Sequence, residues 1–110
     1  MKPEQQRIAI AKACGWTQYK WRCGQHSYST WVEPGETYKI GDRQIFNVPG
    51  YLNDLNAMHE AEKVLFDKLY WAACDYEQCL QKITSSWAWH ATAAQRAEAF
   101  LRTLNLWTWA

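Results

Sequence analysis

Aromatic side chains set the strongest constraint on how this chain can fold. Its 110 residues include eight Trp, six Tyr and three Phe. A Trp side chain buries a large area but is seldom fully enclosed, and its indole N–H needs a hydrogen-bond partner. The core of one small domain cannot enclose all of these rings. We therefore predict that some of them line a groove or an interface.

Length, charge and hydropathy predict one soluble domain over residues 1–110. Hydrophobic residues make up 48% of the chain, enough to close a core. The formal net charge is +1, and the basic residues are scattered from Lys2 to Arg102, which disfavours extended nucleic acid as a partner. No apolar window is long enough to span a membrane, and the start MKPEQQRIAIAK lacks the apolar segment of a signal peptide. These features predict a cytoplasmic protein with no membrane partner.

The cysteines indicate neither a disulfide scaffold nor a metal centre. The four of them, Cys14, Cys23, Cys74 and Cys79, form no CxxC pair and no repeated spacing, so reduced thiols are expected. Cys14, Cys23 and His26 could supply part of a zinc site, but a regular set of four ligands is missing. We predict no metal and no other cofactor.

The pattern of apolar and turn-forming residues predicts an α+β domain in which a small antiparallel sheet packs with three to four helices. A first helix is predicted to begin at Pro3 and to end at Gly15. Runs rich in β-branched or aromatic residues predict strands at 16–22, 30–32, 37–40 and 44–48. Gly24 interrupts the first run, and Pro34-Gly35 separates the second from the third as a hairpin turn would.

Three more helices are predicted in the second half of the chain. The first starts at Asn53, with an apolar arc of Leu55, Met58, Ala61 and Leu65. The next runs from about Phe66 to Ile83 and is also amphipathic. Residues 87–90 alternate like a short strand. Thr92 and Gln95 then form a capping box before the last helix, which Asn105 can end in a left-handed conformation.

The helix that begins YLNDLNAMHEAEKV carries a polar arc that needs an explanation. Asn53 is predicted to be its N-cap, and Asp54 suits the first turn because the helix dipole favours an acid there. Asn56 and His59 have no such structural role, so either a solvated face or a ligand contact accounts for them. Glu62 falls within the apolar arc, so it must snorkel, pair with a base or border a cavity.

Three stretches of the sequence resemble one protein family. YLNDLNAMHEAEKVL, ATAAQRAEAFLRTLNLW and ACGW are similar to the phage ABA sandwich domain proteins, small proteins of bacteriophages and prophages. The resemblance covers both ends of the chain and leaves out the middle, from Tyr19 to Val48. It implies an α-β-α layered sandwich encoded by a phage accessory gene, in the cytoplasm of an infected bacterium. It implies no established enzymatic activity.

The sequence also lacks the motifs of common enzymes. It has no G-x-S-x-G elbow, Walker loop, H-E-x-x-H helix or paired carboxylates, and its three histidines lie far apart. We therefore predict that the protein is not an enzyme.

Two kinds of binding function remain open. The first is a sponge that sequesters a nucleotide second messenger of bacterial immunity, which needs aromatic rings for a base and amides, bases or helix N-termini for phosphates. Besides the aromatic run at 16–21, the candidate ligand-binding residues are Arg22, Arg43, Tyr51, Asn53, Asn56, His59, Trp87, Trp89 and His90.

The second is an inhibitor or adaptor that docks on a host or phage protein through exposed tryptophans. Trp71 projects from the polar face of its predicted helix, where either a partner or a covering loop accounts for it. The candidate interface residues are Trp71, Trp107 and Trp109. The aromatic excess also predicts a homo-oligomer, a dimer or larger.

Overall fold

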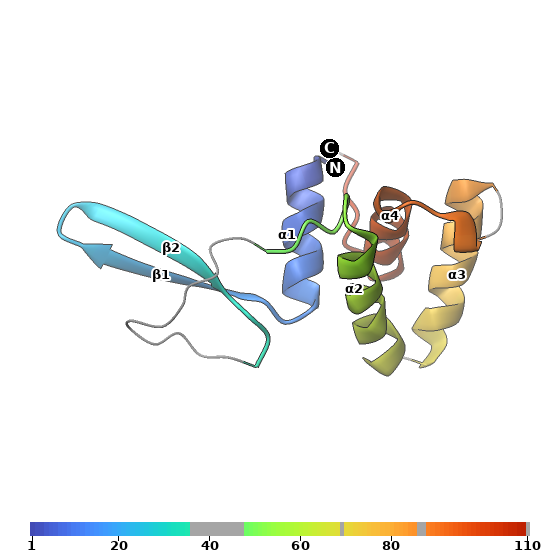
Figure 1. The fold of residues 1–110 in the computed structure, drawn as a ribbon, viewed down its shortest axis with the longest axis horizontal. Coiled ribbons are helices and arrows are strands. Elements are labelled where there is room, and N and C mark those ends of the chain that lie inside the picture. Colours follow the sequence, from blue (N-terminus) through green and yellow to red (C-terminus); the bar gives the residue numbers. More distant parts are fainter. Residues whose placement is uncertain (36–47, 69, 86–87, 110) are drawn as a thin grey trace.

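The computed structural model describes residues 1–35, 48–68, 70–85 and 88–109, without the side chains of 68, 70, 71 and 88. Within these ranges the elements are α1 (Pro3–Ala13), β1 (Thr17–Cys23), β2 (His26–Val32), α2 (Leu55–Lys68), α3 (Tyr70–Thr84), the 3-10 helix η1 (Ala88–His90) and α4 (Ala93–Thr103). The predicted α+β class, with a small antiparallel sheet and four helices, is confirmed (Figure 1). No helix in these ranges is both long and apolar enough to cross a bilayer.

The four helices share one core, and α4 lies at its centre. This helix packs against α1, α2 and α3. Its Phe100 and Leu101 are fully buried, together with Ile10 of α1, Met58 of α2 and Leu80 of α3. These residues recur at the helical spacing that places them on one face of each helix. The core therefore holds together segments from both ends of the chain.

The ends of α1 and α4 follow the sequence signals closely. Pro3 occupies the first turn of α1, and Gly15 follows its end with a φ of 98°. At the start of α4, the Gln95 N–H donates to Thr92 Oγ1 at 3.2 Å and the Thr92 N–H donates to Gln95 Oε1 at 2.9 Å. Asn105, after its end, has a φ of 59°. The predicted capping box and left-handed end are confirmed.

The start of α2 corrects the predicted cap. The helix begins at Leu55, and Oδ1 of Asp54 accepts from the N–H of Asn56 at 3.0 Å and of Ala57 at 3.3 Å. Asn53 lies one residue earlier, in the turn, where its own N–H donates to the carbonyl of Gly50. The prediction of Asn53 as the N-cap is wrong because the carboxylate that reaches the exposed N–H groups belongs to Asp54.

Replacing the true cap should therefore cost more than replacing the predicted one. We expect Asp54→Ala to lower the free energy of unfolding by about 1 kcal/mol, the usual cost of losing an N-cap. Asn53→Ala is the matched control and should change it by only a few tenths of that. Urea denaturation of both variants tests the assignment, which equal losses would contradict.

Two other predicted boundaries are also wrong. The helix expected from Phe66 begins at Tyr70, and Phe66 belongs to the last part of α2, where its ring is exposed. Residues 88–90 form η1 instead of a strand, and no described strand lies beside them to supply a hydrogen-bonding edge. Leu55, predicted on the buried arc of α2, is exposed because it is the first residue of the helix.

The sheet is a hairpin of β1 and β2. Their register runs from Thr17 opposite Val32 to Cys23 opposite His26, so the turn is Gly24-Gln25. Gly24 has a φ of 63°, a conformation that favours glycine at the first position of a two-residue turn. Gly24 therefore joins two strands, and β2 starts four residues before the predicted strand. The predicted strand 37–40 lies outside the described residues, as does 44–48 except for Val48, which is buried and not in a strand.

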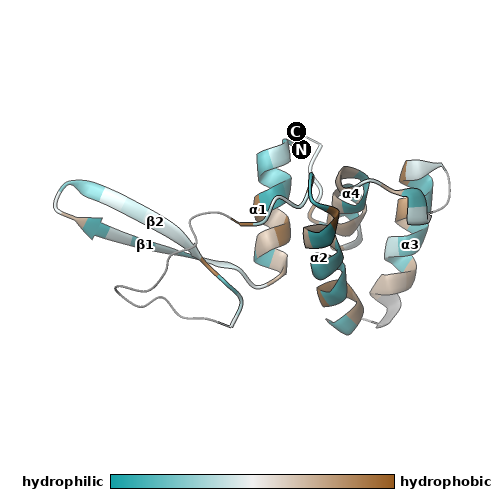
Figure 2. Ribbon diagram, in the orientation of Figure 1, coloured by the Kyte–Doolittle hydropathy of each residue, from teal (hydrophilic) through white to brown (hydrophobic). Residues whose placement is uncertain are grey.

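The hairpin extends away from the helices on the side of α1 (Figure 1). Its base is anchored to the helical core by Trp16 and Trp31, while most other hairpin residues are exposed among the residues that the structure describes. In Figure 2 most of the hairpin is white to teal, since the Kyte–Doolittle scale places Tyr and Trp on the hydrophilic side of neutral. Hydropathy alone therefore does not reveal the rings that the hairpin carries.

Candidate functional site

The hairpin presents a row of aromatic rings, which we call the aromatic face: Tyr19, Trp21 and Tyr28. Opposed residues of antiparallel strands share a face of the sheet, and Trp21 is opposite Tyr28. The ring centroids of this pair are 5.5 Å apart with planes 21° from parallel, and Tyr19 lies 5.7 Å from Trp21. Tyr19 and Tyr28 are exposed. The three rings thus form one contiguous aromatic surface on the hairpin.

Basic side chains project from the face of the hairpin opposite the aromatic face, because successive residues of a strand point to opposite faces. Lys20 and Arg22 alternate with the rings of β1, both are exposed, and residues 17–32 contain no Asp or Glu. A pocket of about 450 Å³, the hairpin pocket, is lined by Lys20, Trp21, Arg22, Ser27, Tyr28 and Ser29. It combines aromatic rings, cations and hydroxyl groups. This set can hold an anionic ligand that also carries an aromatic ring.

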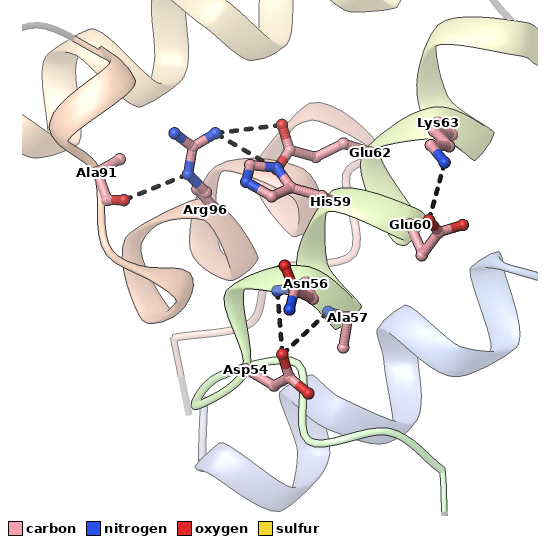
Figure 3. Close-up of polar contacts among 9 residues, drawn as sticks. All are labelled: Asp54, Asn56, Ala57, His59, Glu60, Glu62, Lys63, Ala91 and Arg96. Atoms are coloured by element: carbon pink, nitrogen blue, oxygen red, sulfur yellow. Dashed lines mark hydrogen bonds and ion pairs between the residues drawn. The ribbon is translucent and has the colours of Figure 1, made fainter.

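The polar arc of α2 has a structural use in the second half of the helix. The Nδ1 atom of His59 lies 3.1 Å from Oε1 of Glu62, and Arg96 Nη1 donates to both oxygens of Glu62 at 3.3 and 3.2 Å (Figure 3). Arg96 Nε also donates to the carbonyl of Ala91 at 3.2 Å. Glu62 and Arg96 are both buried. Of the three expectations for Glu62, pairing with a base is confirmed, and the pair ties α4 to α2.

Tyr76 of α3 lies beside this ion pair. Its side chain is only 3% exposed, and its buried hydroxyl lies near both Glu62 and Arg96. Burial, followed by the negative charge of Glu62, raises the pKa of the phenol well above its ordinary value. Burial raises the pKa of Tyr51 in the same direction.

These shifts predict that the fold weakens in alkali. The protonated phenol is favoured in the folded state, so it contributes fully to stability below the pKa of about 10 that a tyrosine has in the unfolded chain. That stabilisation is lost as the pH rises from this value towards the higher pKa of the folded protein. We expect the urea midpoint to fall between pH 9 and pH 11, and Tyr76→Phe to reduce the fall. An identical alkaline fall in the variant would contradict this role for Tyr76.

Trp89 and Arg96 line a second cavity, which we call the Trp89 groove. It measures about 470 Å³ and lies among Phe66 of α2, residues of α3, η1 and α4. Trp89 is 75% exposed, and its ring centroid is 5.0 Å from that of His90. The groove therefore has an open aromatic rim above a buried polar floor.

A third cavity, the C-terminal groove, contains the predicted interface tryptophans. Its volume is about 540 Å³, and Trp107, Trp109, Arg102 and Lys82 contribute to its lining. The guanidinium of Arg102 lies 5.5 Å from the ring centroid of Trp107 and 4.6 Å from that of Trp109. Trp109 is 78% exposed, whereas Trp107 is partly buried against the core. The two rings therefore present different areas to a partner.

The predicted ligand-binding residues lie in separate parts of the fold. Arg22 is on the hairpin, Trp89 and His90 are on η1, and Asn53, Asn56 and His59 are exposed at or near the start of α2. The ring of Tyr51 is buried in the core. Arg43 and Trp87 lie outside the described residues, as does the side chain of the predicted interface residue Trp71.

The hairpin pocket also contains residues that the sequence interpretation did not single out. Lys20, Ser27, Tyr28 and Ser29 complete it, and the strand register places Tyr28 opposite Trp21 and Ser29 opposite Lys20. The sequence feature that could have pointed to this pocket is the absence of acidic residues from 17–32 together with the alternation Tyr-Lys-Trp-Arg.

The cysteines and other metal-binding residue types form no cluster in the described part of the chain. The four cysteines are free thiols, and the described residues contain no group of three or more His, Cys, Asp or Glu side chains placed to hold a metal ion.

Comparisons with protein-family models, with curated proteins and with solved structures found no match. The functional proposal therefore depends on the geometry of the cavities and the residues that line them.

Proposed function

We propose that this protein is a non-enzymatic binder of a small nucleotide-type ligand and that the hairpin holds the ligand. The observation that carries the proposal is the hairpin pocket, which Trp21 and Tyr28 of the aromatic face line together with Lys20 and Arg22, on strands without an acid. A nucleobase stacks on such rings with a gain of about 1–3 kcal/mol per base. Lys20 and Arg22, which project from the opposite face of the same hairpin but also line the pocket, attract its phosphates.

The size of the hairpin pocket supports a small ligand. Its volume of about 450 Å³ lies within the range of roughly 300–1,000 Å³ that is usual for small-molecule sites. The hydroxyl groups of Ser27 and Ser29 can donate to phosphate or sugar oxygens. A mononucleotide or a cyclic dinucleotide has the required combination of base, sugar and phosphate.

The resemblance to phage ABA sandwich proteins suggests which nucleotide to seek. A phage accessory protein that binds without catalysis would act as a sponge for a nucleotide second messenger of the host immune system, in the cytoplasm of the infected cell.

The test is to incubate the protein with an extract of bacteria whose immune signalling is active, release bound material by heating, and identify it by mass spectrometry. The proposal expects an unmodified nucleotide. A chemically changed product would indicate an enzyme, and an empty protein would contradict the proposal.

Exposed tryptophans favour a second candidate function, docking on a protein. Trp89 and Trp109 are 75% and 78% exposed, and large exposed aromatic rings are frequent anchors of protein interfaces. The partner can be a host or phage protein or a second copy of this chain, as a homo-oligomer would require. Light scattering distinguishes these cases: a dimeric mass that becomes monomeric in Trp89→Ser or Trp109→Ser would assign the tryptophan to self-association.

A further inference from the structure

The hairpin face opposite the aromatic face carries a regular set of polar side chains, which we call the basic face: Lys20, Arg22, Ser27 and Ser29. The strand register places Lys20 opposite Ser29 and Arg22 opposite Ser27, so these side chains project from the same face of the sheet. All four residues are exposed, and all four line the hairpin pocket. The basic face therefore consists of two cross-strand pairs, each with one cation and one hydroxyl group.

The cations of the basic face have no acidic partner among the described residues. Residues 17–32 contain no Asp or Glu, and the ion pairs between described side chains include neither Lys20 nor Arg22. In the C-terminal groove, by contrast, Arg102 Nε lies 3.2 Å from Oε2 of Glu98. The uncompensated positive charge of the hairpin pocket therefore favours an anionic ligand.

The spacing of the two pairs indicates how many phosphate groups the ligand carries and how far apart they lie. Lys20 and Arg22 are two residues apart on β1, as are Ser27 and Ser29 on β2, which separates the pairs by about 7 Å. A phosphate centred on each pair would receive one cation and one hydroxyl donor. Directly joined phosphates share an oxygen and lie much closer together than this. Phosphates on opposite sides of a ribose match the spacing better.

We propose that the basic face binds a ligand with two phosphate groups separated by a sugar. One phosphate lies on Lys20 and Ser29, and the other lies on Arg22 and Ser27. This inference rests on the proposed function, since it takes a nucleotide as the ligand of the hairpin pocket, and it adds the number and the spacing of the phosphates. A nucleoside bisphosphate has this chemistry, and so does a linear or cyclic dinucleotide.

The test is calorimetric titration with three nucleotides of the same base, in an adenine and a guanine series at one ionic strength. The 3′,5′-bisphosphate has a phosphate on each side of the ribose, the 5′-diphosphate has two joined phosphates, and the 5′-monophosphate has one. We expect the bisphosphate of at least one series to bind about 30-fold more tightly than the monophosphate, through one more charge-assisted and one more neutral hydrogen bond. The diphosphate should gain at most about 5-fold, the effect of an exposed charge pair.

Dinucleotides of the better base identify the source of the two phosphates. The cyclic dinucleotide and the linear dinucleotide with a 5′-phosphate each carry two phosphates set apart by a sugar. At least one of them should bind as tightly as the bisphosphate, and the tighter of the two is the form that the pocket takes. If both bind only as tightly as the monophosphate, the proposed spacing is wrong.

Variants of the basic face locate the two phosphates. Lys20→Gln and Arg22→Gln should each reduce the affinity for the bisphosphate towards that of the monophosphate, because each leaves one phosphate without its cation. Lys12→Gln, which removes an exposed cation of α1, is the matched control and should change nothing. Ser27→Ala/Ser29→Ala keeps every charge and should weaken the bisphosphate about 10-fold.

The outcomes separate this inference from the proposed function. If the bisphosphate binds no more tightly than the diphosphate, the inference is overturned, and the proposed function stands if Trp21→Leu weakens the diphosphate. If Lys12→Gln loses as much affinity as Arg22→Gln, the phosphates respond to diffuse charge and the inference is likewise overturned. If no nucleotide of either series binds, both are overturned.

Discussion

Replacing Arg96 by Met is expected to lower the free energy of unfolding by about 3 kcal/mol. The change keeps most of the side-chain volume but leaves Glu62 buried without its guanidinium partner, and removing one member of a buried ion pair typically costs about 3–5 kcal/mol. We expect the lower end of that range because His59 Nδ1 remains 3.1 Å from Glu62. Urea denaturation measures the loss.

Two matched variants show whether the loss comes from the stranded charge. The double variant Glu62→Leu/Arg96→Met removes both charges and should recover most of the stability, because an apolar pair of similar volume no longer buries an uncompensated ion. Lys63→Ala breaks the exposed contact with Glu60 and should leave stability nearly unchanged, since surface ion pairs contribute little. If Arg96→Met alone were as stable as the parent protein, the Glu62–Arg96 contact would not be what holds α4 to α2.

Truncating Phe100 should destabilise the fold by a similar or larger amount. Its ring is 0% exposed at the centre of the helical core, and Phe→Ala in a core costs about 3–5 kcal/mol through lost burial and the cavity that remains. Phe66→Ala is the control, because that ring is exposed and its loss leaves no enclosed cavity. Thermal and urea unfolding should separate the two variants clearly. Equal losses would mean that α4 is not the centre of the core.

Local signals predicted those parts of the fold that local chemistry decides. Pro3, Gly15 and the Thr92–Gln95 capping box each act within a few residues, and all three appear where they were expected. The N-cap of α2 was misplaced by one residue because Asn53 and Asp54 are both good caps, and only the path of the preceding turn decides which one reaches the N–H groups. Residues 87–90 alternate like a strand, but a strand also needs a neighbour, which a local pattern does not supply.

The candidate sites depended on longer-range information. The apolar position of Glu62 predicted a base or a cavity, but Arg96 is 34 residues away in sequence, and only the packing of α4 on α2 brings them together. The aromatic excess predicted exposed rings without saying which ones. Tyr28 joins Trp21 through the register that the Gly24-Gln25 turn sets. The direction in which the hairpin leaves the helices likewise follows from packing at its base, where Trp31 meets the core.

The most direct test of the account is equilibrium dialysis of the protein against a panel of adenine and guanine nucleotides, from mononucleotides to cyclic dinucleotides. We expect at least one of them to bind, and the hairpin variant Trp21→Leu/Arg22→Gln to weaken that binding by at least about 50-fold, because it loses one stacking contact and one charge-assisted hydrogen bond. The matched control Trp109→Leu/Lys12→Gln removes an exposed indole and an exposed cation from outside the hairpin and should bind as the parent does. Unchanged affinity in the hairpin variant, or an equal loss in the control, would contradict the assignment of the ligand to the hairpin.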